Sequence, residues 1–194
     1  MFVQSSLFAQ EAVTLVSDAE GGIVYHPGVV TEAQAQAWYA ALRPQVPWRS
    51  EDRPMYDRIV AVPRLMASVT LNDPTRPPEM DAALAAVQSV APAPYTRVGL
   101  NLYRDGRDSV ALHSDRLHDL APRQPISILS LGAPRDMLIK PKAGGPAQRV
   151  RLEPGSVLVM SHACQRTHEH GIPKSAEPLG PRMSLAFRVR CPAA

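Results

Sequence analysis

Proline recurs along most of this chain. The 194 residues include 20 prolines, which are spread through the sequence instead of forming a tract. Each proline fixes its own φ and lacks the N–H that a helix interior or a central strand needs, so the elements between prolines must be short. The spacing therefore favours short strands joined by turns over long helices.

The composition is that of a folded protein, with 45% hydrophobic and 20% charged residues. The length suits one domain with a real core better than two. The net charge of +3 is a mild basic bias, compatible with a polyanionic partner. No apolar run approaches the roughly 20 residues that span a bilayer. We expect a single domain over residues 1–194 and no association with a membrane.

The compartment follows from the cysteines and the N-terminus. Cys164 and Cys191 make no disulfide framework and are expected to be free thiols in a reducing environment. Residues 1–13 have no basic segment before an apolar run and no cleavage pattern of small residues, so they do not resemble a signal peptide. We expect a cytoplasmic protein. The sequence leaves its oligomeric state open.

Two helices are expected in the first half of the chain. The first covers residues 31–45, with Thr31 as N-cap and Pro44 as its end, and the second covers residues 77–90. Residues 44–58 are polar, broken by proline and rich in arginine, which indicates an exposed loop.

Short β-type runs dominate the second half. Turn residues separate them at fairly regular intervals, which is typical of a sandwich or barrel. Helices followed by a series of strands make the α+β class, with the chemistry on the β part. Two more short strands are expected near the N-terminus. The expected strands cover residues 12–17, 22–28, 96–103, 110–113, 126–131, 136–140, 149–152, 156–160 and 182–190.

His113 and Asp115 lie two residues apart in one of these runs. Alternate residues of a strand face the same side, so an imidazole and a carboxylate converge there. Such a pair alone is more often a hydrogen-bonded pair on a sheet edge than a metal site. The metal site therefore requires a third ligand from elsewhere in the chain. The stretch "SHACQRTHEHGIPK" contains three of the six histidines, namely His162, His168 and His170.

Two histidines and one carboxylate on one face of a metal leave three positions open. This set is typical of non-haem Fe(II) oxygenases and not of structural zinc. Oxygenases of this kind often use a keto acid as co-substrate. Its second carboxylate is best bound by an arginine, whose guanidinium is always charged and can donate two parallel hydrogen bonds. Arg182 and Arg188 are candidates, and on a regular strand both face one side while Leu185 and Phe187 face the core.

Eight short motifs follow one another along the chain: "YHPGVV", "VPWR", "VPRL", "NLYRDGRDSVALHSD", "SLGAPR", "PGSVLVM", "QRTHEHGIPK" and "PRMSLAFR". They run from about residue 23 to 190. Their order and spacing, more than any single motif, resemble the AlkB-like family of Fe(II)- and 2-oxoglutarate-dependent dioxygenases.

The resemblance implies a metal site and a binding site for 2-oxoglutarate. His113, Asp115 and His170 match the Fe(II) ligands, while His168 takes a place where relatives often carry an aromatic residue.

The co-substrate site is implied in the same way. Arg182 matches the arginine that holds the far carboxylate of 2-oxoglutarate, and Arg188 matches the second arginine of an R-x5-R motif. Asn101 and Tyr103 match the pair that hydrogen-bonds the co-substrate from the preceding strand.

The resemblance also implies a fold and an activity. The fold is a double-stranded β-helix of the jelly-roll type, with the site in its mouth and the N-terminal helices packed outside. The activity consumes O₂ and removes alkyl groups oxidatively from nucleic-acid bases, so the expected partner is alkylated or single-stranded nucleic acid.

Two departures from the family concern the substrate. Arg116 and Leu117 stand where many relatives carry acidic residues that help to read the damaged base. The run "MASVTLNDPTRPP" lacks the aromatic residues that stack the flipped base in repair enzymes. Candidates for that stacking role elsewhere are Trp48, Tyr56 and His118.

Alternatives therefore stay open. The same oxygenase chemistry can act on a protein side chain or a small molecule, and a β-barrel of this kind can serve as a non-catalytic binding module. Two groups of basic residues can either contact phosphates or simply face solvent. They are Arg49, Arg53, Arg58 and Arg64, and Lys140, Lys142, Arg149 and Arg151.

Overall fold

The computed structural model describes residues 11–50, 52–55 and 58–191. In chain order the elements are β1 (Val13–Val16), β2 (Ile23–His26), α1 (Glu32–Gln45), β3 (Asp52–Met55), β4 (Arg58–Ala61), β5 (Leu65–Thr70), α2 (Glu79–Val90), β6 (Arg97–Tyr103), β7 (Val110–His113), the 3₁₀ helix η1 (Leu117–Asp119), β8 (Ile126–Gly132), β9 (Arg135–Pro141), β10 (Gln148–Leu152), β11 (Val157–Met160), α3 (Cys164–Thr167), β12 (His168–Ile172) and β13 (Arg182–Arg188).

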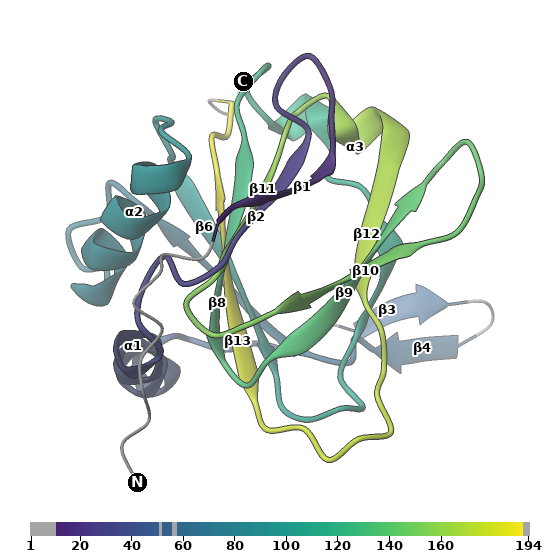
Figure 1. The fold of residues 1–194 in the computed structure, drawn as a ribbon. Helices are drawn as coiled ribbons and strands as arrows, with labels where there is room; N and C mark the ends of the chain where they lie inside the picture. The colour runs from purple at the N-terminus through teal and green to yellow at the C-terminus, as the bar shows by residue number, and fades with distance from the viewer. Residues whose placement is uncertain (1–10, 51, 56–57, 192–194) are drawn as a thin grey trace, which may run out of the picture.

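Two antiparallel sheets face each other across the interior (Figure 1). The larger has the order β1-β2-β11-β8-β13-β6-β5, and the smaller has the order β10-β9-β12-β7. Helices α1 and α2 lie outside the larger sheet. This arrangement confirms the expected α+β jelly roll with its N-terminal helices packed outside. Among the described residues, no helix has the length and apolar character needed to cross a bilayer.

Helix α1 begins as its sequence predicts. The Thr31 hydroxyl accepts a hydrogen bond from the Gln34 N–H at 3.2 Å, which satisfies a backbone donor of the first turn. Pro44 does not end the helix but lies inside its last turn, which runs to Gln45. Proline removes its own N–H donor here as it would anywhere in the helix, but only one helical residue follows it, so little of the helix is disturbed.

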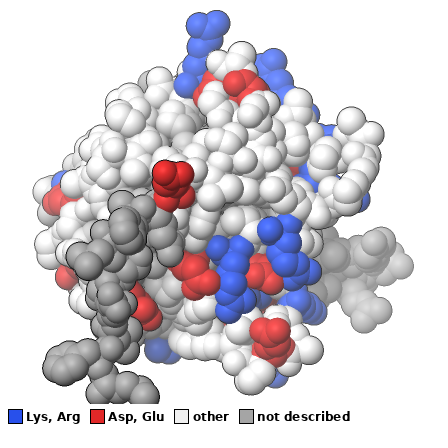
Figure 2. All heavy atoms as spheres, viewed as in Figure 1, with Lys and Arg blue, Asp and Glu red and all other residues white. Residues whose placement is uncertain are grey.

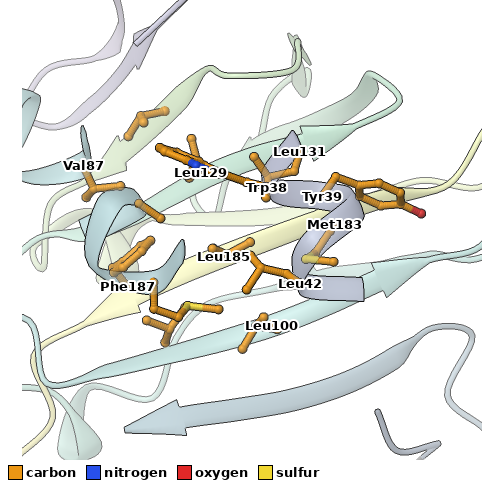
Figure 3. Packing of buried hydrophobic residues seen from close by; sticks show 14 of the residues in the cluster. Trp38, Tyr39, Leu42, Val87, Leu100, Leu129, Leu131, Met183, Leu185 and Phe187 are labelled. Carbon is orange, nitrogen blue, oxygen red and sulfur yellow. The ribbon is translucent and has the colours of Figure 1, made fainter. Parts of the chain in front are cut away.

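The outer face of the larger sheet packs against these helices. Trp38 and Leu42 of α1 and Val87 of α2 contact a cluster that includes Leu185 and Phe187 of β13 (Figure 3). The intervening residues of β13 turn the other way and line the space between the sheets. The alternation predicted for residues 182–188 is therefore confirmed, and it leaves the arginines facing inward.

The loop predicted over residues 44–58 is wrong in its second half. Strands β3 and β4 pair as an antiparallel hairpin, with Asp52 opposite Ala61. Pro54 does not prevent the pairing, because both strands of a two-stranded sheet are edge strands, where a missing N–H is tolerated. Strands β5 and β12 were not predicted either.

Candidate metal centre and its two cavities

A cluster of two histidines and one aspartate lies where β7 meets β12. His113 is directly opposite His170 in the strand pairing, and their ring centroids are 4.5 Å apart. Gly171 permits this close approach, because a Cβ there would come within 2.9 Å of the Val110 carbonyl oxygen. Asp115 completes the group, in which one ligand atom from each of the three residues lies within 4.8 Å of the others.

This cluster is the one group of potential ligands that satisfies such a distance limit within the described ranges. Of the three histidines in the segment 161–174, the structure brings only His170 to His113 and Asp115. His162 is buried after β11, and the His168 ring lies 2.9 Å from the Thr167 hydroxyl.

Both imidazoles have a free lone pair for a metal. His113 Nδ1 lies 2.9 Å from the Ala111 carbonyl oxygen, which can only accept, so Nδ1 carries the proton and Nε2 is free. Burial lowers the pKa of His170 to about 4, and the neighbouring His113 acts in the same direction. His170 is therefore neutral at physiological pH, the form in which imidazole binds metals.

The carboxylate of Asp115 is held as an anion. Burial alone would raise its pKa, but the charge and hydrogen bonds of Arg188 outweigh burial and keep that pKa below its usual value. Arg188 donates from Nε at 2.7 Å and from Nη2 at 3.1 Å, one bond to each carboxylate oxygen. Such a bidentate pair fixes the orientation of the carboxylate as well as its charge.

A buried glutamine holds the backbone of Asp115. The side-chain oxygen of Gln165, on α3, accepts the Asp115 N–H at 2.9 Å. The adjacent Ser114 hydroxyl donates to the His168 carbonyl at 2.8 Å. Two hydrogen bonds thus tie the segment between the ligand candidates to the histidine-rich segment. Burial raises the pKa of the Cys164 thiol next to Gln165 to about 11, so this cysteine is protonated and unreactive at neutral pH.

A small pocket extends from the cluster between the two sheets. It is lined by Asn101, Tyr103, Ile128, Met137, Ile172, Arg182, Ser184, Ala186 and Arg188, together with both histidines, Arg64 and Val110.

Arg182 supplies the buried charge of this pocket. Its side chain is fully buried, and its Nη2 donates to the Ser130 hydroxyl at 2.9 Å. Its Nε has no hydrogen-bond partner within the described chain. Burial lowers the pKa of Arg182 to about 10, so it remains a cation at neutral pH. A buried cation with an unused donor and no carboxylate beside it is suited to receive an anionic group.

Stacking fixes the position of Arg182. Its guanidinium lies 5.4 Å from the centre of the Tyr103 ring, and the guanidinium of Arg135 lies 5.5 Å from the same ring. Arg135 is itself buried and donates to the backbone carbonyls of Asp105, Asp108 and Pro173. Sequence reasoning missed Arg135, because no residue near it in the chain indicates that three segments converge on it.

Asn101 lies further along the pocket. Its side-chain oxygen accepts from Arg64 Nε at 2.8 Å, and its amide donates to the Ser184 hydroxyl at 3.4 Å. Arg64, which the sequence groups with Arg49, Arg53 and Arg58 as a phosphate contact or a solvent-facing residue, points inward and lines both the pocket and the cleft outside it.

The two arginines of β13 do not hold the same group. They are six residues apart on a regular strand, which separates them by roughly 20 Å. Arg182 lies at one end of the pocket, and Arg188 pairs with Asp115 at the other. The sequence did not predict the ion pair between Arg188 and Asp115. The length of the strand does, however, exclude that Arg182 and Arg188 bind the same carboxylate. A contact between Arg188 and the co-substrate stays a prediction.

An open cleft of about 1380 Å³ lies on the other side of the cluster. Its lining contains His113 and Asp115, and no Phe, Tyr or Trp occurs among the described residues that line it. Two of the stacking candidates are engaged elsewhere. Trp48 donates to the Arg43 carbonyl and packs against the core, and His118 pairs with Asp119. Tyr56 lies outside the described residues.

The cations that line the cleft outnumber the carboxylates. The cationic residues are Arg49, Arg64, Arg116, Lys174, Arg188 and Arg190, and the acidic residues are Asp115 and Asp119. The side chains of Arg53 and Arg58 lie outside the described part of the chain.

The second basic group, on β9 and β10, is largely neutralised. Arg149 and Arg151 both pair with Asp136, and Arg151 also pairs with Glu153. Lys142 donates to the Gln165 carbonyl at 2.8 Å. Figure 2 shows basic and acidic groups side by side on the viewed face. These contacts favour a role in folding over a free basic surface.

Comparisons with known proteins agree with this geometry. A family model described as the 2OG-Fe(II) oxygenase superfamily matches residues 22–188. "DNA oxidative demethylase ALKBH2" of Homo sapiens is 27% identical over 187 residues, covering 92% of this chain and 68% of that protein. "Alpha-ketoglutarate-dependent dioxygenase alkB homolog 3" of Mus musculus is 27% identical over 190 residues, covering 88% and 66%. This chain thus spans about two thirds of the length of these relatives.

A solved structure shares the fold. "The structure of OsALKBH1" superposes with a TM-score of 0.59 at 18% identity, covering 87% of this chain and 96% of that chain.

Proposed function

This chain belongs to the 2OG-Fe(II) oxygenase superfamily, in its AlkB-like branch, and from that premise we propose that it oxidatively removes alkyl groups from bases of single-stranded nucleic acid. One observation carries the proposal: a small pocket with a buried arginine and an open cationic cleft meet at a His-Asp-His cluster. The first cavity suits a small dianion, and the second suits a polyanion.

In this proposal His113, Asp115 and His170 hold Fe(II). Two imidazoles and one ionised carboxylate are the donor set of a non-haem iron site. When bound, Fe(II) and 2-oxoglutarate supply the oxidation, in which O₂ and 2-oxoglutarate yield succinate and CO₂ while an N-methyl group becomes N-hydroxymethyl. The hydroxymethyl group then leaves as formaldehyde, which leaves the ring nitrogen unalkylated: with its N–H in a keto base, or with its lone pair in adenine or cytosine after loss of a proton.

The chain's own residues position the reactants. Arg182 receives the distal carboxylate of 2-oxoglutarate, and the stacked Tyr103 and Arg135 keep its guanidinium in place. Asn101 offers its amide from the neighbouring strand. The apolar side chains that line the pocket exclude water around the co-substrate, which strengthens the contact between Arg182 and the carboxylate.

The cleft supports a nucleic-acid substrate. Arg49 and Lys174 are exposed on its lining and can contact phosphates on either side of a target nucleotide. A base must leave the helical stack to reach a cluster at the bottom of a cleft, so a single strand is the easier substrate.

One observation favours a second candidate function. The described lining of the cleft offers no aromatic ring other than imidazole to stack a base. The same oxidation on a protein side chain or small molecule is therefore the alternative.

The test measures succinate formed from 2-oxoglutarate by the protein loaded anaerobically with Fe(II), after O₂ is admitted. Three single-stranded oligonucleotides are compared with an unmethylated strand; they carry 1-methyladenine, 3-methylcytosine or 3-methyluracil. We expect succinate to rise with at least one methylated strand, together with loss of the methyl mass.

Succinate that ignores every strand, with no loss of methyl mass, would contradict the nucleic-acid substrate and favour the alternative. Failure to form succinate at all would contradict the enzymatic proposal.

A further inference from the structure

Among the residues that the structure describes, both carboxylates that line the cleft are in ion pairs with arginines, so neither is available to bind a cationic ligand. Asp115 pairs with Arg188 at 2.7 Å, and Asp119 pairs with Arg190 at 3.0 Å. Arg116 makes no ion pair with any residue of the described ranges and is exposed on the cleft wall. Among the described residues of the lining, Arg116 therefore adds a positive charge that no carboxylate neutralises.

Arg116 is presented by a backbone that is fixed on both sides. Before it, the Asp115 N–H is bound by Gln165. After it, η1 and the residues that follow are hydrogen-bonded to the segment just beyond β13. Cys191 donates its N–H to the Asp119 carbonyl at 3.2 Å, and Ala121 donates its N–H to the Val189 carbonyl at 2.9 Å. The backbone that carries this arginine is thus anchored one residue from a candidate metal ligand, on the lining of the cleft.

Alkylated bases fall into two classes that such a cation distinguishes. Methylation at N1 of adenine or N3 of cytosine gives a base with a full positive charge, whereas methylation at N3 of thymine or uracil or at N1 of guanine leaves the base neutral. Two like charges about 8 Å apart at an effective dielectric constant of about 30 repel by enough to disfavour binding roughly tenfold.

Hydrogen bonding acts in the same direction. An arginine has donors only. Beside the alkylated ring nitrogen, thymine, uracil and guanine carry a carbonyl oxygen at C4 or C6, which accepts, whereas adenine and cytosine carry an amino group there, which donates. Arg116 can therefore donate to the carbonyl oxygen of a keto base at this position, whereas the amino group of adenine or cytosine offers it no acceptor there.

We propose that this cleft selects N-alkylated bases that carry no positive charge, and that Arg116 is the residue that determines this specificity. The inference rests on the proposed function. It names the neutral keto bases, alkylated thymine, uracil or guanine, as the substrate class.

The test compares two oligonucleotides identical except for one base, 3-methyluracil or 3-methylcytosine. These bases carry the methyl group on the same ring nitrogen and differ in a carbonyl against an amino group and in charge. We expect kcat/KM to be about tenfold higher for 3-methyluracil. The ratio of kcat/KM for 3-methyluracil to kcat/KM for 3-methylcytosine should fall about tenfold in Arg116→Gln, to near one, because the repulsion is lost. In Arg116→Glu the same ratio should fall about 100-fold, because the repulsion becomes an attraction. Arg97→Gln removes an exposed arginine that does not line the cleft and should leave the ratio unchanged.

Each other outcome is decisive. Equal or faster reaction of 3-methylcytosine in the unaltered protein overturns the inference while the proposed function stands. Arg116 variants that lose activity equally on both strands make Arg116 a phosphate contact and overturn its selective role. Reaction with neither strand, nor with any other methylated strand, overturns the proposed function itself.

Discussion

The small pocket and the open cleft share a wall but are built differently. The pocket is lined by residues of β6, β8 and β13 from one sheet and of β7, β9 and β12 from the other, and Arg182, which makes no ion pair with any described residue, is fully buried. The cleft is lined mainly by residues of loops and strand ends, and Arg49, Arg116 and Lys174 are exposed.

The difference teaches where specificity can change. A buried charge held by stacking and hydrogen bonds is costly to alter, so the pocket is committed to one kind of anion before any ligand arrives. An exposed charge on a loop costs little to replace, because surface substitutions usually change stability by a fraction of a kcal/mol, about ±0.5. The co-substrate is thus fixed by the fold, whereas the choice of substrate is adjustable.

Loss of a residue on the shared wall should affect both cavities. We expect His113→Ala to lower turnover by well over about 100-fold, since even partners that only orient metal ligands contribute 10–100-fold. The fold should persist, because His113 is only half-buried. Succinate assays and circular dichroism check this result. Near-normal turnover of the variant would remove His113 from the metal site.

The pocket side should respond to acid. His170 has a pKa of about 4 in the folded protein against about 6.5 in an unfolded chain, so only the unfolded state takes up this proton between those pH values. The stabilisation is complete above pH 6.5 and is lost as the pH falls to 4, which amounts to about 3 kcal/mol. Urea unfolding of the metal-free protein should show this loss, and His170→Gln should lack it. Equal pH slopes in the two proteins would contradict the prediction.

A substitution confined to the pocket should spare the cleft. We expect Arg182→Met to raise the concentration of 2-oxoglutarate required roughly 30-fold, as loss of about 2 kcal/mol from charged hydrogen bonds predicts. Affinity for a single strand should not change. The free energy of unfolding without 2-oxoglutarate should also fall somewhat, because the variant loses the hydrogen bond to Ser130 and the contact of the guanidinium with the Tyr103 ring. An unchanged requirement for 2-oxoglutarate would assign its carboxylate to another residue.

Gln165 tests how much the wall depends on its support. Gln165→Leu removes the acceptor of the Asp115 N–H, and we expect Fe(II) affinity to fall about tenfold. The matched control is Gln148→Leu, at an exposed position of β10. Titration with Fe(II) under anaerobic conditions measures both. If the two variants bind Fe(II) equally well, the contact with Asp115 does not position the ligand.

The smallest effect is expected on the cleft side. Arg49→Gln should weaken binding of single strands a few-fold whatever their sequence. It should also reduce the slope of log K against log salt concentration by about 0.7, the value for one phosphate contact on a single strand. The 2-oxoglutarate requirement should not move. A slope equal to that of the unaltered protein would show that Arg49 touches no phosphate.

The same contrast explains what the sequence could predict. The inward placement of Arg182 and the outward placement of Leu185 follow from the period of a strand, and His113 and Asp115 were visible as a pair. The support of the site was not visible. Gln165 reaches Asp115 across 50 residues of chain, and Arg188 reaches it across 73. Such contacts depend on how the sheets are placed, and no local pattern encodes them.

The position of β13 has a consequence for the growing chain. It pairs with both β6 and β8, which are not paired with each other, and no other described strand of the larger sheet is synthesised after it. Until the ribosome has released residues 182–188, two strands rich in leucine and isoleucine have an open edge between them, and such edges are prone to aggregation. Nascent-chain protection would therefore matter most during the interval between the synthesis of β8 and that of β13.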